Sequence, residues 1–283
     1  MKKKKKNFIF SVRDALVSGE FFDIYWDEKK KCARTDGKFL FKVQDYYESE
    51  KYSSHLQKSY SFFDFIYNYV RNIMFTYKLQ FFRNLIKKPG KLLDFGCGAG
   101  GFLSYMRKKN FHVFGVENNE KALKICREKK IKIYKSLQNV SEKKFDLITF
   151  WHSLEHMPKP EETIKEIHPL LSKKGILIIA LPNFNSHDCH YYKEKWAALD
   201  VPRHLWHFTP KGIKELVINS GFEFIKSFPL WFDVFYISIL SEKLKGSRFS
   251  FLTGTLKGLY FTFISIFTRR HSSISFVFRK KLL

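Results

Sequence analysis

Short apolar runs alternate with longer amphipathic stretches through the middle of the chain. The runs are residues 91–95, 112–116, 131–134, 145–150 and 175–183. In the stretches between them apolar residues recur at helical spacing, as in Phe102, Leu103 and Met106. Buried parallel strands are nearly continuous apolar runs, and each needs a crossover helix to reach the next strand. The pattern therefore predicts an α/β domain in which helices cover both faces of a parallel sheet.

Two more strands are predicted toward the end of the chain, over residues 222–228 and 273–279. Thr209-Pro210 is typical of a helix start and Gly221 of a helix end, so a helix is expected before the first of them. Between the two strands lie two aromatic and aliphatic blocks, residues 231–240 and 259–267. Each block is shorter than the roughly 18 apolar residues that span a bilayer. We expect two helices that cap the binding site, dock on another subunit or lie on a membrane surface.

The region before residue 91 is less regular. Met1 is followed by five lysines and a short apolar run, residues 7–12, which mimics the start of a signal peptide. Arg13 and Asp14 interrupt the run and no small-residue cleavage site follows, so we predict a cytoplasmic protein with a basic tail. One or two helices are predicted within residues 56–88, from apolar positions at helical spacing: Phe62, Phe63, Ile66, Tyr69, Val70, Ile73 and Met74.

The chain of 283 residues has a net charge of +24, which favours contact with nucleic acid or with an anionic membrane. The lysines are scattered and no RNA-binding motif or recognition helix stands out, so no specific nucleic-acid partner is expected. Peripheral contact with the inner membrane surface stays open. The four cysteines, Cys32, Cys97, Cys126 and Cys189, form no C-x-x-C pair, so neither a disulfide framework nor a metal site is predicted.

The first apolar run ends in an acid that is followed by closely spaced glycines. Gly96, Gly98 and Gly101 match the G-x-G-x-x-G pattern, and Glu117 lies about 20 residues further on, where an acid binds a ribose hydroxyl. Asp94 favours S-adenosylmethionine over a dinucleotide, because its carboxylate would repel a pyrophosphate and attract the ammonium and sulfonium groups. An NAD-dependent oxidoreductase and a non-enzymatic basic scaffold are the alternatives.

Four ordered motifs resemble those of class I S-adenosylmethionine-dependent methyltransferases. They are residues 92–100, which are similar to motif I, residues 115–118 of the second strand, residues 145–158 of the fourth strand and its loop, and residues 175–183 of the fifth strand. The resemblance implies a Rossmann-like sheet of seven strands with an antiparallel last strand, and S-adenosylmethionine as the cofactor. The contacts that it implies are Asp94, Gly96, Cys97, Gly98 and Gly100 at the methionine end, Glu117 at the ribose, and Asn118, Ser136, Leu137 and Trp151 around the adenine.

The start of the chain carries a second resemblance. Residues 17–22 and 46–55 are similar to methyltransferases that begin with a small zinc ribbon, in which two cysteine pairs hold the metal. The second pair would fall around Trp26 to Thr35, and only Cys32 is present there. Four ligands are needed for a structural zinc site. We therefore interpret this segment as a metal-free remnant of the ribbon.

His152-Ser153-Leu154-Glu155-His156 matches the H-x-x-E-H pattern of inverted zinc proteases. The segment leaves a strand and soon meets Pro158, whereas a protease needs both histidines on one helix face. In the methyltransferase interpretation it lies at the carboxyl ends of the strands, beside the transferable methyl group. His156 is then a candidate general base and His152 a second catalytic candidate, and a structural role for either stays open. Some related quinone-type O-methyltransferases hold a divalent ion with an extra acid in this loop; His152 stands in that neighbourhood here, so no ion is predicted.

Residues 200–204, Asp-Val-Pro-Arg-His, resemble the D-x-P-R-H segment that follows the fifth strand in this family. The resemblance implies that the segment faces the methyl acceptor. His204 is the third catalytic candidate, and Arg203 either clamps an anionic group or pairs with Asp200. Residues 187–190, His-Asp-Cys-His, offer metal-ligating types but are crowded on one short loop, so a solvated lid is expected there.

These features predict five segments: a degenerate ribbon-like segment (1–45), a helical cap (46–90), the S-adenosylmethionine-binding core (91–230), an aromatic helical insertion (231–271) and the final strand with a basic tail (272–283). The predicted reaction is in-line attack of an acceptor oxygen or nitrogen on the sulfonium methyl group. Family association points to a small molecule, a sugar or a lipid-linked acceptor. A homodimer stays open.

Overall fold

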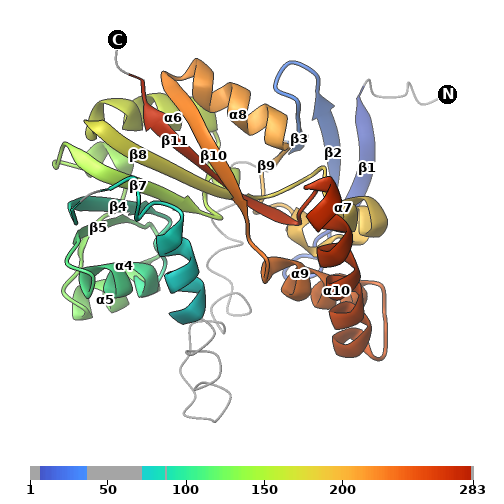
Figure 1. Ribbon diagram of the computed structural model, residues 1–283. Helices are drawn as coiled ribbons and strands as arrows, with labels where there is room; N and C mark the ends of the chain where they lie inside the picture. Colours follow the sequence, from blue (N-terminus) through green and yellow to red (C-terminus); the bar gives the residue numbers. More distant parts are fainter. Residues whose placement is uncertain (1–6, 37–71, 87, 282–283) are drawn as a thin grey trace.

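The computed structural model describes residues 7–36, 72–86 and 88–281. Its larger sheet has seven strands in the order β10-β11-β8-β7-β4-β5-β6 (Figure 1). The strands are β4 (Lys91–Phe95), β5 (His112–Val116), β6 (Lys132–Tyr134), β7 (Phe145–Trp151), β8 (Leu171–Pro182), β10 (Phe222–Pro229) and β11 (Ser273–Lys280). Strand β11 runs antiparallel to both β8 and β10, whereas the pairs formed by β4 to β8 are parallel. The predicted Rossmann-like sheet with an antiparallel last strand is confirmed.

Alternating residues of the central strands face two separate apolar cores. Leu93 and Phe95 of β4 belong to one core, while Leu92 belongs to the other. Helices α6 (Pro160–Ile167) and α8 (Pro210–Asn219) pack on the first core, and α4 (Gly101–Arg107) and α5 (Glu120–Glu128) pack on the second, together with residues 72–86 (Figure 1). Because both faces are covered, the strands are apolar along most of their length, which is why their positions could be predicted.

The N-terminal segment forms a second, antiparallel sheet with a strand from much later in the chain. Strands β1 (Phe8–Arg13), β2 (Phe21–Asp27) and β3 (Cys32–Thr35) follow one another, and β3 pairs with β9 (Trp206–Phe208). Cys32 lies opposite Phe208 and is 1% exposed. Burial raises the pKa of its thiol to about 12, so this cysteine acts as a core residue. The predicted ribbon-like segment is therefore an integral part of the fold.

Several sequence-based predictions fall outside the described residues. These are the basic tail at residues 1–6, the second part of the ribbon resemblance at residues 46–55, and the helical positions Phe62, Phe63, Ile66, Tyr69 and Val70. Of the predicted helical cap, residues 72–80 are helical.

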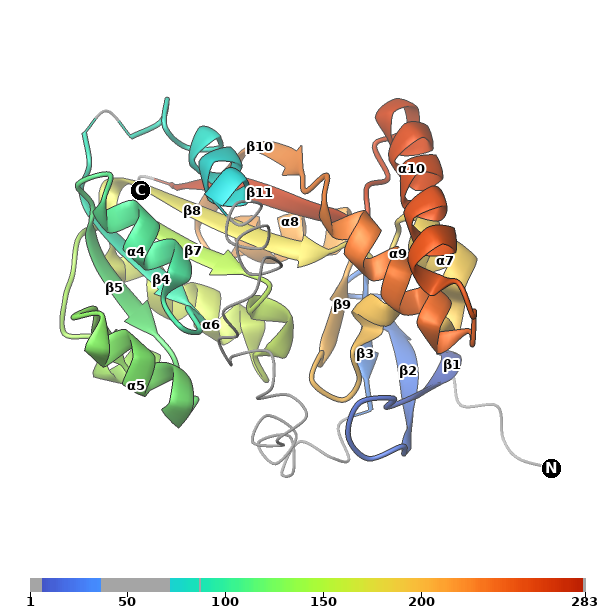
Figure 2. The same cartoon turned by 90° about the horizontal axis from the view of Figure 1, so that it is seen from below.

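The insertion between β10 and β11 is a helical hairpin made of α9 (Asp233–Leu244) and α10 (Ser250–Thr268), which lie side by side (Figure 2). The prediction that neither block is long enough to span a bilayer is wrong for α10. This helix has 19 residues, because it begins well before the apolar block at residues 259–267. By length and composition it is the one helix among the described residues that is suited to cross a membrane, and 22% of its most apolar window is buried.

The solvated lid expected at residues 187–190 is a short packed helix, α7 (His187–Tyr192). Asp188 is 1% exposed and accepts hydrogen bonds from the Trp196 indole at 2.7 Å and the Ser272 hydroxyl at 2.5 Å. Cys189 is also buried. The segment therefore belongs to the core beneath the hairpin.

Candidate active site

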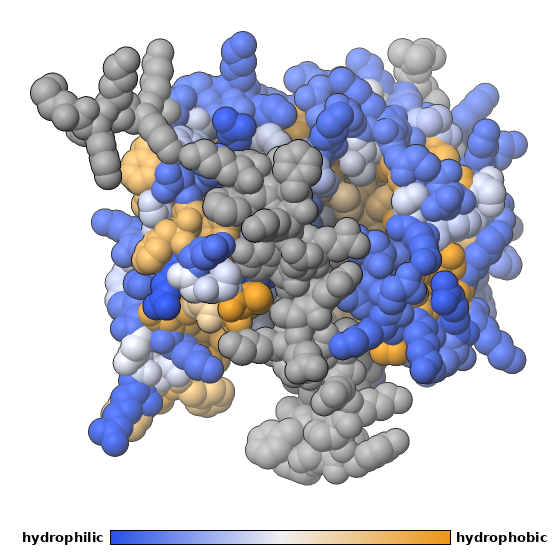
Figure 3. Space-filling model, turned by 180° about the vertical axis from the view of Figure 1, so that it is seen from behind, coloured by the Kyte–Doolittle hydropathy of each residue, from blue (hydrophilic) through white to orange (hydrophobic). Residues whose placement is uncertain are grey.

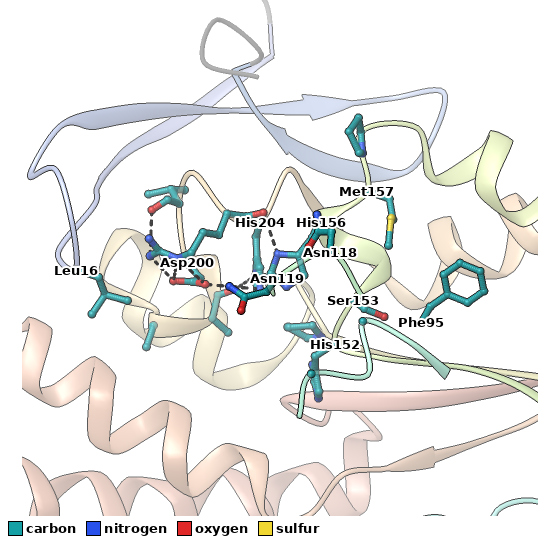
Figure 4. A pocket seen from close by; sticks show the side chains of 18 of the residues that line it. Leu16, Phe95, Asn118, Asn119, His152, Ser153, His156, Met157, Asp200 and His204 are labelled. Atoms are coloured by element: carbon teal, nitrogen blue, oxygen red, sulfur yellow. Dashed lines mark hydrogen bonds and ion pairs between the residues drawn. The ribbon is translucent and has the colours of Figure 1, made fainter. Parts of the chain in front are cut away.

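A cavity of about 2210 Å³ lies at the carboxyl ends of the parallel strands. One half is lined by residues that follow β4, β5 and β6. The other half is lined by the N-terminal strands and their connection, by residues 194–204 and by α9 (Figure 4). Carboxyl-terminal strand edges are where open α/β sheets bind their ligands. We refer to the half lined by residues after β4, β5 and β6 as the cofactor half, and to the other as the acceptor half.

The glycine loop after β4 opens into the cofactor half. Gly96, Gly98 and Gly100 have φ angles of 65°, 52° and 68°, in the left-handed region that favours glycine. A side chain at Gly98 would meet no atom within 4 Å. Gly98 also lines the cavity, so a ligand can approach the backbone closely at this point.

Glu117 follows β5 and is fixed by three backbone amides. One carboxylate oxygen accepts from the Gly98 N–H, and the other accepts from the N–H groups of Asn118 and Asn119, each at 2.9 Å. The side chain is half-buried and lines the cavity. Each carboxylate oxygen has about two acceptor sites, so the three backbone bonds leave one site for a ribose hydroxyl, and the predicted ribose contact of Glu117 stays a prediction.

Asp94 lies beneath the glycine loop and is 3% exposed. Its carboxylate accepts a hydrogen bond from the Thr149 hydroxyl of β7 at 2.6 Å. Burial raises the pKa of Asp94 to about 7, against the opposite influence of Thr149 and of the Lys78 ammonium. A cationic ligand nearby would favour the ionised form, which suits the predicted contact with the methionine end of the cofactor.

The remaining predicted cofactor contacts fall into two groups. Asn118, Ser136 and Leu137 line the cavity, the last two at the start of a short 3-10 turn after β6. Cys97 and Gly100 shape the loop from behind, and the Cys126 thiol donates to the Gly98 carbonyl at 3.2 Å. These placements agree with the predicted site without testing its contacts.

Trp151, at the end of β7, does not lie where the sequence analysis expected it. Its ring packs edge-on against Phe102, with centroids 5.5 Å apart, and belongs to the core on the α4 side of the sheet. Leu137 packs against the core on the opposite face. Unlike Leu137, Trp151 does not line the cavity. This position of the Trp151 indole does not support the predicted packing contact with the adenine ring.

Lys78, which the sequence analysis did not single out, interacts electrostatically with Asp94 beneath the cofactor half. It lies in the helical residues 72–80, and its ammonium is 4.1 Å from the centre of the Trp151 ring. Burial lowers its pKa, whereas Asp94 and Asp233 oppose that shift. An ammonium beside Asp94 can pair with the carboxylate of a bound methionine group. A single lysine within the aromatic run of residues 73–82 was the available signal.

His152 is held as a cation by two acids. Its Nε2 lies 2.9 Å from an Asp233 oxygen on α9, and its Nδ1 lies 3.5 Å from a Glu155 oxygen. Burial opposes the charged imidazolium, but the two carboxylates outweigh it and raise the pKa of His152 to about 9. A group that is protonated at neutral pH cannot accept a proton, so these contacts favour the structural role that the sequence analysis left open for His152. Its contact with Asp233 fastens α9 to the site.

His156 and His204 come together from separate loops, with ring centroids 4.6 Å apart (Figure 4). His156 Nδ1 lies 3.0 Å from the Arg203 carbonyl oxygen, and His204 Nδ1 lies 2.8 Å from the Ala198 carbonyl oxygen. A carbonyl only accepts, so each neutral ring carries its proton on Nδ1 and its lone pair on Nε2. Burial and the neighbouring His156 lower the pKa of His204 to about 4. Both predicted catalytic histidines line the cavity.

The N-terminal sheet holds the loop that carries His204. The Thr35 hydroxyl donates to the His204 carbonyl at 2.6 Å, and the Thr35 N–H donates to Leu205. Arg203 is 1% exposed and is bound to Asp200, with its Nε 3.0 Å from one carboxylate oxygen, and to Asp14 at 3.5 Å. Of the two roles considered for Arg203, the structure shows pairing with Asp200 and leaves the guanidinium buried.

Glu155, His156 and His204 also have the spacing of a metal site, since one ligand atom from each lies within 4.8 Å of the others. Neither Glu155 oxygen has a hydrogen-bond partner among the described residues. The Nδ1–H to carbonyl contacts of both imidazoles are the arrangement that metal-bound histidines use. The three side chains therefore fit a divalent cation, and the expectation that the chain holds no metal stays a prediction.

The fold and the cofactor half define a Rossmann-like enzyme that uses S-adenosylmethionine. A family model described as "Methyltransferase domain" matches residues 66–227, which is more than half of the chain. The chain belongs to this family, and it is a class I S-adenosylmethionine-dependent methyltransferase.

Curated proteins with similar sequences share about a quarter of their aligned residues with this chain. A ubiquinone biosynthesis O-methyltransferase of Actinobacillus pleuropneumoniae serotype 7 (strain AP76) is 27% identical over 179 residues, covering 58% of this chain and 71% of that protein. One from Coxiella burnetii (strain RSA 493 / Nine Mile phase I) is 26% identical over 145 residues, covering 48% and 59%. The match to the second spans less than two thirds of its length.

Solved structures show the same fold at low identity. A possible histamine N-methyltransferase from Thermotoga maritima has a TM-score of 0.50 at 17% identity, covering 77% of this chain and 97% of that one. A putative sarcosine dimethylglycine methyltransferase from Galdieria sulphuraria has a TM-score of 0.50 at 16% identity, covering 73% and 84%. These likenesses concern the fold alone.

Proposed function

We propose that this methyltransferase acts on a hydroxyl group of a small, largely apolar acceptor. The observation that carries the proposal is the pair of imidazoles of His156 and His204, which line the cavity and whose Nδ1 atoms each lie within 3.0 Å of a backbone carbonyl oxygen. A hydroxyl must lose its proton as it is methylated, and a positioned imidazole lone pair accepts it. The names of the curated relatives, which are O-methyltransferases, support the same chemistry.

The lining of the acceptor half supports an apolar acceptor. Large apolar side chains surround it: Leu16, Phe21, Phe232, Tyr236, Ile237, Leu240 and Leu244. Four cationic groups, Arg13, Lys195, Arg203 and Lys243, line the same half, and Arg203 is paired with Asp200. An apolar ring or chain with a hydroxyl at its buried end fits such a lining.

In the proposed reaction the acceptor oxygen attacks the methyl carbon in line with the sulfonium sulfur. The new O–CH3 bond forms as the S–CH3 bond breaks, and S-adenosylhomocysteine leaves. His156 Nε2 receives the hydroxyl proton, and the carboxylates of Glu155 and Asp200 stabilise the imidazolium ion. A divalent cation bound by Glu155, His156 and His204 would occupy the lone pair of His156, and it would then promote loss of the proton by lowering the pKa of a coordinated hydroxyl, in place of the histidine base.

A panel of acceptors with labelled S-adenosylmethionine tests the proposal. We expect methyl transfer to phenols and catechols that carry an apolar substituent, and little transfer to amines of the same shape. Preferential methylation of the amines would overturn the proposed hydroxyl chemistry while leaving the methyltransferase class intact.

A further inference from the structure

One side of α10 is a continuous apolar surface. Nine large side chains there are 54–74% exposed, and we refer to them as the apolar face of α10: Phe249, Phe251, Leu252, Leu256, Leu259, Tyr260, Phe263, Ile266 and Phe267. At about 100° per residue, the eight that lie within the helix occupy one contiguous half of its circumference. Patches of this size on a soluble protein mark an interaction site. The opposite face of the molecule, seen from behind, is mostly hydrophilic, with apolar side chains in smaller areas (Figure 3).

The opposite side of α10 is packed on α9 and holds the apolar face outward. Its buried residues are Gly254, Gly258, Phe261 and Ser265, which lie about one turn apart. A side chain at Gly258 would approach Phe235 Cδ1 to 2.7 Å, and one at Gly254 would collide with the backbone of Ile239. Glycines at these two positions let the helix backbones approach closely. The hairpin is therefore a firmly packed unit.

The threonine hydroxyls of α10 are satisfied within the helix. The hydroxyls of Thr253, Thr255, Thr262 and Thr268 each donate to the carbonyl four residues earlier, at 2.7–3.1 Å. Lys257 is the one charged residue between 250 and 268, and its ammonium lies 4.4 Å from the centre of the Tyr191 ring. An apolar solvent would leave few of these groups without a partner.

Cationic residues stand at both ends of the helix. Lys243, Lys245 and Arg248 precede it, and Arg269 and Arg270 follow it. The whole chain has a net charge of +24. A second copy docked through the same face would bring like charges together, which is unfavourable. One leaflet of an anionic bilayer offers apolar chains beneath a layer of phosphates, so a helix that lies in its plane can bury its apolar face while the cations at both ends meet phosphates.

We propose that the apolar face of α10 docks in the plane of an anionic bilayer, with the flanking cations at the lipid phosphates. The helix lies on the membrane and does not cross it, because its other side is packed on α9. This docking does not depend on the acceptor chemistry. Resting on the proposed function, it also gives the acceptor a route: Phe232, Tyr236 and Leu244 of the hairpin are exposed and line the cavity, so an apolar acceptor enters from the bilayer.

Vesicle co-sedimentation of the full chain tests the docking. The double variant Leu256→Asp/Phe263→Asp places two charges on the apolar face, at side chains that are 57% and 62% exposed. We expect the wild type to bind vesicles of phosphatidylglycerol and phosphatidylcholine, more weakly at high salt, and the variant to lose about tenfold or more in vesicle affinity. Ile218→Asp, at a side chain of α8 that is 45% exposed, is the matched control and should bind like the wild type.

Two further measurements separate the alternatives. Unchanged affinity of the double variant for S-adenosylmethionine shows that the methyltransferase domain is folded, so that a loss of vesicle binding concerns the surface alone. Light scattering gives the oligomeric state. A wild type that ignores anionic vesicles, or a stable dimer that the double variant converts to a monomer without any vesicle binding, would overturn the proposal and make α10 an interface between two copies.

Discussion

The two halves of the cavity differ in how their residues are held. In the cofactor half, Gly96, Gly98 and Glu117 come from one compact β-loop unit and are fixed by backbone hydrogen bonds within it. In the acceptor half, His156 and His204 come from loops 48 residues apart and depend on the N-terminal sheet through Thr35. The structure of a local unit can be predicted from its sequence, whereas the positions of residues from distant segments depend on tertiary contacts. The two halves should therefore respond differently to mutation.

The largest effect is expected in the acceptor half. His156→Ala should lower kcat by about 10²–10⁴-fold, because the proposed base is removed, while calorimetric affinity for S-adenosylmethionine stays the same. The measurement uses the best hydroxyl acceptor from the panel. His112→Ala, at an exposed position at the start of β5, is the control. Parallel losses in cofactor affinity would show that the two halves are not separable.

Glu117→Ala should weaken cofactor binding, the quantity that His156→Ala leaves unchanged. Loss of a charge-assisted contact to the ribose costs about 1.5–3 kcal/mol, or roughly tenfold to a hundredfold in Kd. Calorimetry with S-adenosylmethionine measures it, and Glu128→Ala at the exposed end of α5 is the matched control. Unchanged affinity in a folded variant would remove Glu117 as the ribose ligand.

Cofactor affinity should also depend on pH through Asp94. Burial raises the pKa of this carboxyl to about 7, so it is largely protonated in the free protein below that pH. The positive charges of the cofactor favour the carboxylate, so binding releases a proton and strengthens as pH rises toward 7, by up to about tenfold per unit. The affinity levels off above that pH. Asp94→Asn should bind more weakly with a flatter profile, and an equally steep profile would assign the titration to another group.

Metal removal should have the smallest effect. We expect no stoichiometric zinc and an unchanged Tm in EDTA, because Cys32 is a buried core residue and β3 is fastened by pairing with β9. Elemental analysis and thermal unfolding decide this. One zinc per chain would turn attention to Glu155, His156 and His204, and would mean that the acceptor half is organised by an ion.

Sequence patterns predicted the large sheet closely because its strands are buried on both faces. The run at residues 112–116 is β5 to the residue. They also singled out Glu117, His156 and His204 from short local motifs; all three line the cavity, and their roles stay predictions. They missed Lys78 and the His152 to Asp233 contact, since each joins segments far apart in the chain. The length of α10 was missed because Gly254 and Gly258 interrupt its apolar pattern, although their packing against α9 is what places them in a helix.

The pairing of β3 with β9 has a consequence for how the chain folds as it is made. Cys32 emerges from the ribosome 176 residues before its partner Phe208. At 5–20 residues per second this delay is on the order of ten to thirty seconds. During this delay the edge of β3 has unpaired backbone N–H and C=O groups, which can form hydrogen bonds with other chains. The small sheet formed by β1, β2, β3 and β9 is thus completed only after most of the large sheet has been translated. Chaperone binding or misassembly of the first three strands is expected during this delay.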